Sequence, residues 1–291
     1  MHALLTHPAA QAVLAPFLIA LLTAELLQRM RLSGLAVIAG FAITVYLVSG
    51  FSYAPLTSTH KLVWLSVASG LLAIPLSLIN GSLWRPVLTV LAAAAAVWVA
   101  QRILMQQPTA VALQWGAGCA LYVGWIVFWM DDLQGSPVRA GSAGMALGLG
   151  TGAAILIAGS SILGKYDLAI GSAAAAYLFI MFASNSHLSC GRSFTLPLSL
   201  IAGLSAILAV LTARLPWYAL AVLALIPLAA KLPVSDKSPV WVQTTLLSAA
   251  TLVCASGAAY LSWHSNGWAA LRAPQKIQTF ERHNLEAGSN V

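Results

Sequence analysis

Residues 88–100 read LTVLAAAAAVWVA, a stretch with no charged residue and with none of the polar/apolar alternation that a membrane barrel strand shows. Inside a bilayer only helices and closed barrels satisfy every backbone hydrogen bond. The stretch therefore predicts a membrane helix, and similar apolar runs recur along the whole chain.

The composition of the chain supports the same interpretation. Hydrophobic residues make up 60% of the 291 positions and charged residues only 7%, whereas a soluble domain carries about 25% charged residues. A soluble protein with so few charges could not cover its surface with polar groups. Lipid is therefore the solvent that fits this sequence.

We expect an all-α integral membrane protein, a bundle of about ten transmembrane helices. A spanning helix needs roughly 20 apolar residues. We assign the spans to residues 9–27, 33–53, 61–80, 85–101, 110–130, 139–161, 168–184, 194–213, 215–230 and 241–263. Residues 1–263 then form one polytopic domain. Residues 264–291 are a polar, flexible C-terminal tail that begins as a short surface helix.

The polar break DDLQGSPVR, residues 131–139, separates five spans from five. An odd number of spans in each half makes the halves 1–130 and 139–263 run in opposite directions, as in transporters built from two inverted repeats. Spans 3–4 and spans 8–9 each contain a tight turn with Trp and Pro. Apolar helices resemble one another by default, so the alternative of no repeat stays open.

The charges are sparse, with a net charge of +7 from 14 basic and 7 acidic residues. The Lys and Arg residues lie singly at the ends of apolar runs, where they meet lipid headgroups, so we expect no nucleic-acid partner. They divide evenly between the two sides and predict no orientation. The first residues lack Lys and Arg, so we expect an uncleaved anchor in a bacterial inner membrane.

The sequence offers little for a metal or a cofactor, and we expect neither. Cys119, Cys190 and Cys254 form no C-x-x-C pair. No histidine lies in the middle of a span, which argues against haem. The stretch GSSILGKY, residues 159–166, matches a phosphate loop by chance, because a membrane helix precedes it and Tyr166 replaces the required Ser or Thr.

Residues 184–193, SNSHLSCGRS, form a polar break that permits two interpretations. His187 could activate Cys190 as a nucleophile, or contact a substrate. Alternatively, the segment is a connecting loop in which Ser193 caps the next helix and Arg192 anchors at the headgroups. We favour the loop, because no third catalytic group is evident.

Glu25 is the only acidic residue inside a predicted span. Glu25 is one helical turn from Arg29, which suggests an ion pair or, alternatively, a proton relay. Asp131 and Asp132 lie at the end of the fifth predicted span, where they could simply be solvated at the membrane boundary. Alternatively, the two carboxylates could hold a magnesium ion on a diphosphate substrate. We expect no charged residue at the centre of any span.

Polar and aromatic side chains on two spans could line a site for an uncharged or mildly amphipathic small molecule. One helical face carries Gln114, Gly118, Tyr122, Trp125 and Trp129, and another carries Thr244, Ser248 and Thr251. The candidate substrate-binding residues are Gln114, Tyr122, Trp125, Thr244, Ser248 and His187. Ordinary helix packing is the alternative interpretation.

Gly144, Gly148 and Gly152 repeat every four residues and predict a smooth ridge for close helix packing. Three functions are consistent with these features. The first is a small-molecule permease with a site near the midplane. The second is a non-transporting scaffold whose ridge binds a partner helix or a second copy. The third is an intramembrane enzyme that uses His187 and Cys190.

Overall fold

The computed structural model describes residues 7–28, 32–50, 57–78, 83–184, 188, 190–234 and 238–272, with side chains at the C-terminal end described as far as Asn266. Every regular element in these ranges is a helix, and eight of the helices are long and apolar enough to cross a membrane. The chain is therefore an all-helical, multi-pass membrane protein.

The first long span, Ala10–Leu27, combines the π-helix η1 (Ala10–Leu14) with α2 (Ala15–Leu27). The other seven long helices are α4 (Ser58–Leu78), α5 (Trp84–Leu104), α6 (Thr109–Asp132), α7 (Pro137–Ile157), α8 (Ser161–Ser184), α9 (Arg192–Thr212) and α12 (Val240–Arg272).

Two of the ten predicted spans are formed by shorter helical segments. The second consists of η3 (Ser33–Leu35) and α3 (Ala36–Val48), and the ninth of α10 (Trp217–Leu223) and α11 (Ile226–Ala229). The ninth breaks at Ala224 and Leu225, just before Pro227, which cannot donate a backbone hydrogen bond within a helix.

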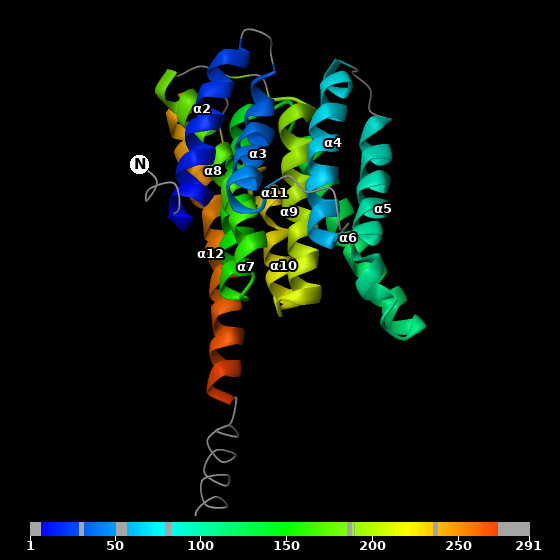
Figure 1. Ribbon diagram of the computed structural model, residues 1–291. Helices are drawn as coiled ribbons and strands as arrows, with labels where there is room; N and C mark the ends of the chain where they lie inside the picture. The colour runs from blue at the N-terminus through cyan, green and yellow to red at the C-terminus, as the bar shows by residue number, and fades with distance from the viewer. Residues whose placement is uncertain are drawn as a thin grey trace, which may run out of the picture.

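The helix α12 is longer than predicted. It continues to Arg272, whereas the sequence placed the end of the last span at residue 263. The expected surface helix is thus a continuation of α12 (Figure 1), and residues 273–291 lie outside the described part of the chain.

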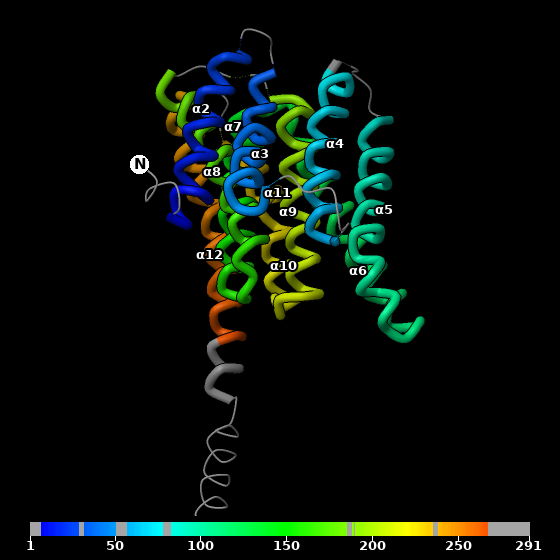
Figure 2. Tube along the Cα trace, in the orientation of Figure 1, coloured from blue at the N-terminus to red at the C-terminus, as the bar shows by residue number. Residues whose placement is uncertain are grey.

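The helix α9 forms the centre of the bundle. It is buried along nearly all its length and packs against α4, α6, α7 and α5. The α5–α6 hairpin lies at one side of the bundle, and α2 and α12 lie at the other (Figures 1 and 2). A helix that is apolar on every side, as α9 is, is expected in such a buried position.

The helices α7 and α8 form an antiparallel pair in extensive contact. The turn between them contains Gly159 at a φ of +99°, a left-handed conformation that favours glycine, and α8 begins two residues later at Ser161. Because the turn is so short, α8 starts well before the predicted limit at residue 168.

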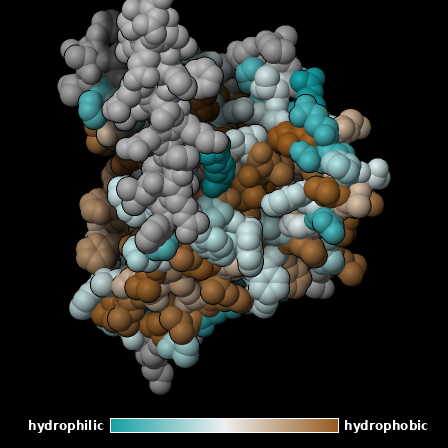
Figure 3. Space-filling model, turned by 90° about the horizontal axis from the view of Figure 1, so that it is seen from below, coloured by the Kyte–Doolittle hydropathy of each residue, from teal (hydrophilic) through white to brown (hydrophobic). Residues whose placement is uncertain are grey.

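The outer surface carries many apolar side chains. Leu26, Leu83 and Leu121 are each more than 70% exposed, far more than isolated apolar residues on a soluble protein would require. Seen from below, along the helices, this end of the bundle shows both hydrophobic and hydrophilic areas (Figure 3). Lipid acyl chains account for the exposed apolar side chains.

Candidate functional site

A carboxylic acid lies inside the helix bundle. Asp167 on α8 has no solvent-exposed surface, and neither of its carboxylate oxygens has a hydrogen-bond partner among the described residues. Each of the other described aspartates, Asp131 and Asp132, forms an ion pair. An ionisable residue within a membrane segment is expensive to bury and suggests a functional role.

Asp167 lies within a membrane helix, although the predicted spans did not include it. The sequence analysis assigned it to the loop before residue 168, but α8 begins at Ser161, six residues earlier. Asp167 is thus about 9 Å along the axis from the first residue of the helix. Gly159 and Ser160, which form the turn, are the feature of the sequence that could have indicated the earlier start of this helix.

Hydroxyl groups on two other helices lie within electrostatic range of the Asp167 carboxyl group, but neither forms a hydrogen bond to it. They belong to Tyr122 on α6 and Ser205 on α9. The Ser205 hydroxyl donates a 2.8 Å hydrogen bond to the backbone oxygen of Ile201. The buried Tyr122 hydroxyl has no hydrogen-bond partner among the described residues. We call Tyr122, Asp167 and Ser205 the Asp167 site.

The glycines of α7 bring α8 and Asp167 into the core. A Cβ atom on Gly148 would lie 2.4 Å from the backbone nitrogen of Gly171 and 3.0 Å from the backbone oxygen of Asp167. Only glycine permits this approach of two backbones. Thr151, on the next turn of α7, is fully buried and its hydroxyl also lacks a partner in the described part of the chain.

Tyr122 also lines a cavity. The cavity has a volume of about 220 Å³ and lies between α6, α9 and α10. Its walls are largely aromatic and aliphatic, and they include Trp115, Gly118, Tyr122, Ile207, Trp217 and Leu220. Trp217 is 70% exposed, so the cavity reaches the surface of the bundle.

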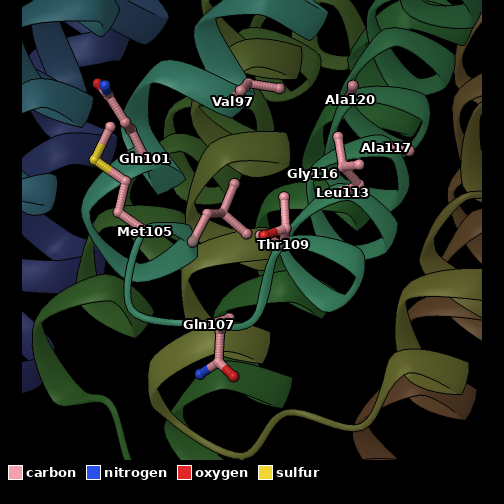
Figure 4. Close-up of a pocket in the computed structure, with 11 residues that line it drawn as sticks. Val97, Gln101, Met105, Gln107, Thr109, Leu113, Gly116, Ala117 and Ala120 are labelled. Atoms are coloured by element: carbon pink, nitrogen blue, oxygen red, sulfur yellow. The ribbon is translucent and has the colours of Figure 1, made fainter.

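Two larger cavities lie elsewhere. One, of about 600 Å³, is formed by the end of α5 and the start of α6, with Gln101 and Met105 on one wall and Leu113 and Ala117 on the other (Figure 4). The other, of about 490 Å³, is an apolar groove between α4, α5 and α9. Neither is lined by any of the unpartnered buried polar groups, so neither is our candidate site.

Comparisons with known proteins assign no family. No protein-family model matches the sequence, and no curated protein matches it. The functional argument therefore depends on the chain's own residues.

A cluster of charges closes the end of the bundle where α6 ends. The buried Asp131 accepts a hydrogen bond of 3.1 Å from Nε of Arg192 at the start of α9. Asp132 pairs with Arg85 on α5 and with Lys231, which follows α11. The guanidinium of Arg85 lies over the Phe128 ring at 3.6 Å. Both carboxylates are thus neutralised by this chain's own basic residues and are not free to hold a magnesium ion.

The predicted substrate-binding residues lie in different parts of the bundle. Gln114 is exposed, and Trp125 donates a 3.0 Å hydrogen bond from its ring nitrogen to the backbone oxygen of Ala224, at the break between α10 and α11. Of this group, Tyr122 is the residue that lines the cavity between α6, α9 and α10.

The hydroxyl groups of α12 face α7. Ser248 forms a 3.2 Å hydrogen bond with Ser142, and Thr251 donates to the backbone oxygen of Ser142. The Thr244 hydroxyl is buried without a partner among the described residues. These residues and Tyr122 do not line one common cavity among those found.

The glycine ridge of α7 contacts helices of the same chain. Gly148 and Gly152 lie against the backbone of α8, and Gly144 lies against Leu198 and Phe194 of α9. This ridge therefore packs within the chain and is not the surface on which a partner helix would bind.

The loop between α8 and α9 buries Cys190. The side chain is only 5% exposed, and burial raises the pKa of the Cys190 thiol well above its ordinary value, although the Tyr177 hydroxyl opposes part of the shift. A neutral, enclosed thiol is a poor nucleophile. His187 lies outside the described residues, and so does Arg29, the expected partner of the exposed Glu25.

Proposed function

We propose that this protein is a small-molecule permease of a bacterial cytoplasmic membrane, with its solute site in the cavity between α6, α9 and α10. The observation that carries the proposal is the unpartnered hydroxyl of Tyr122 in the wall of that cavity, in a bundle that also buries the unpartnered carboxyl group of Asp167. Buried polar groups normally have partners, and a solute or an ion that enters the site would supply them.

The arrangement of the helices supports two inverted halves that move against each other. Residues up to Asp132 supply η1 with α2, η3 with α3, α4, α5 and α6, and residues from Pro137 supply α7, α8, α9, α10 with α11, and α12. An axis in the membrane plane would pair α3 with α8 and α4 with α9. Both pairs are in contact, and each is antiparallel in Figure 1. The cavity lies between α6 of one half and α9 and α10 of the other, as expected for alternating access.

The size and lining of the cavity indicate the class of solute. About 220 Å³ is below the range of roughly 300–1,000 Å³ for pockets that hold drug-sized ligands. The walls are mainly apolar and aromatic, with the Tyr122 hydroxyl as a polar group. The solute is therefore small, uncharged or mildly amphipathic, with an apolar body and a group that bonds to a hydroxyl.

Uptake into proteoliposomes tests the proposal with radiolabelled indole, leucine and phenylalanine as probes. We expect at least one of them to enter protein-containing vesicles faster than empty ones. Gly118→Phe should abolish this uptake, because Gly118 lines the cavity and a Cβ atom there meets no atom within 4 Å. The added ring thus fills the cavity without distorting α6.

Ala117→Phe is the matched control, because Ala117 is the neighbouring residue on α6 and lines the cavity between α5 and α6 instead. It should leave uptake unchanged. If none of the three probes enters, or if Gly118→Phe transports as well as the native protein, the solute site is not in this cavity.

A further inference from the structure

We propose that Asp167 binds and releases one proton in each transport cycle. The inference rests on the proposed permease function and names its coupling ion. The proton comes from water on one side of the membrane, converts the carboxylate to a carboxyl group, and leaves to water on the other side. No electrons are transferred.

The first argument is the surroundings of the carboxyl group. Asp167 is fully buried, with both oxygens unpartnered among the described residues. A lone carboxylate in such a medium is strongly disfavoured, so the group takes up a cation or a proton. The described residues contain no group of three or more His, Cys, Asp or Glu side chains that could hold a metal ion. A proton needs no such set of ligands.

The second argument is that the neighbouring helices bring no fixed counter-charge to Asp167. Arg139 begins α7, about 13 Å along the axis from Gly148, and Arg192 begins α9, about 20 Å from Ser205 and paired with Asp131. Lys165 is two positions away on α8, which places it on the other side of the helix. On α2, α3 and α12, the exposed titratable groups are Glu25, Tyr46, Tyr260 and His264 among the residues whose side chains are described. Cys254 on α12 is half-buried.

The third argument is the position of Asp167 near one end of α8. It lies about 9 Å from the first residue of α8, close to the turn between α7 and α8. Tyr122, which lines the cavity, lies within electrostatic range of Asp167. A hydroxyl group both donates and accepts a proton, so Tyr122 can report the protonation state of Asp167 to a bound solute.

Carbodiimide labelling tests proton binding without a known solute. Dicyclohexylcarbodiimide enters apolar sites and adds to a protonated carboxyl group, which leaves a stable N-acylurea. The full-length protein in detergent is treated at a series of pH values, and the label is located by peptide mass spectrometry. We expect Asp167 to be labelled at pH 6 and the labelling to fall about tenfold for each pH unit above its titration midpoint. Asp132, which is ion-paired, should stay unlabelled.

Three results would overturn the proposal. They are no label on Asp167 at any pH at which the protein is folded, labelling that does not change between pH 6 and pH 9, and protection of Asp167 by sodium ions but not by choline. The last result would assign a sodium ion to the site. Asp167→Asn, which keeps the shape of the side chain, identifies the labelled peptide.

Transport assays separate coupling from transport itself. With a probe that the native protein carries, Asp167→Asn should retain exchange across the membrane but lose accumulation driven by a pH gradient, and Asp167→Glu should restore part of it. If the Asp167→Asn variant accumulates the probe normally, the proposed coupling through Asp167 is wrong, but the proposed permease function still stands. If no probe crosses but labelling is pH-dependent, the permease proposal fails while proton binding stands.

Discussion

The ion pair between Asp131 and Arg192 is a residue-scale feature that joins two helices far apart in the sequence. Both side chains are about 5% exposed, and Arg192 also donates a hydrogen bond to the backbone oxygen of Leu76. Removal of one partner would leave the other charge buried and unpaired, which costs more than the pair itself contributes. The pair therefore controls stability at this end of the bundle.

Asp131→Ala should lower the free energy of unfolding by about 3–5 kcal/mol, since Arg192 is left without its partner. Asp132→Ala, whose carboxylate is 33% exposed, should cost at most about 1 kcal/mol. Thermal unfolding of the purified protein in detergent measures both. Equal losses for the two variants would contradict this interpretation of the charge cluster.

Cys190 provides a residue-scale prediction that depends on pH. The thiolate is the reactive form, so a raised pKa lowers its fraction at every pH, about tenfold for each unit. In a variant with Cys119→Ala and Cys254→Ala, maleimide should modify Cys190 at pH 8 at least about tenfold more slowly than a cysteine placed at the exposed Ser136. Equal rates in the folded protein, with equal rates in denaturant as the control, would restore Cys190 as a candidate nucleophile.

At the scale of elements, the contact between α7 and α8 depends on two facing glycines, Gly148 and Gly171. The backbones approach so closely that a methyl group on Gly148 would overlap the nitrogen and Cα atoms of Gly171. This contact also determines how deeply α8 carries Asp167 into the core.

Gly148→Ala should therefore destabilise the protein by about 1–3 kcal/mol, since the backbone must move to admit the methyl group. Gly118→Ala on α6 is the matched control, because a Cβ atom there has no neighbour within 4 Å, and it should leave stability unchanged or slightly higher. Thermal unfolding in detergent compares the two. A neutral Gly148→Ala would show that the helices are not packed this closely.

The start of α8 decides whether Asp167 lies in a loop or within a membrane helix. Hydropathy placed it at residue 168, because Lys165 and Asp167 lower the average of the preceding segment. The helix instead begins at Ser161, directly after the turn at Gly159. Burial of Asp167 by the helices packed against α8, such as α7 and α9, is a tertiary effect that a window of sequence does not contain.

At the scale of the whole molecule, lipid is required to cover the outside of the bundle. Leu26, Leu83 and Leu121 project from different helices, and each is more than 70% exposed. We expect the expressed protein to remain with the membrane pellet after an alkaline carbonate wash and to be released by detergent. A folded, monodisperse product in the supernatant without detergent would contradict both the fold class and the proposed permease.

The sequence by itself determined the class of the protein and the approximate positions of its helices, because the requirement for apolar side chains and satisfied backbone groups in lipid acts on each segment separately. Even so, two predicted spans became short helices and α12 extended beyond its expected end. The tertiary structure alone decided which polar groups meet. It buried Asp167, paired Asp131 with Arg192, and enclosed Cys190. Each of these outcomes depends on how helices distant in sequence pack around one another.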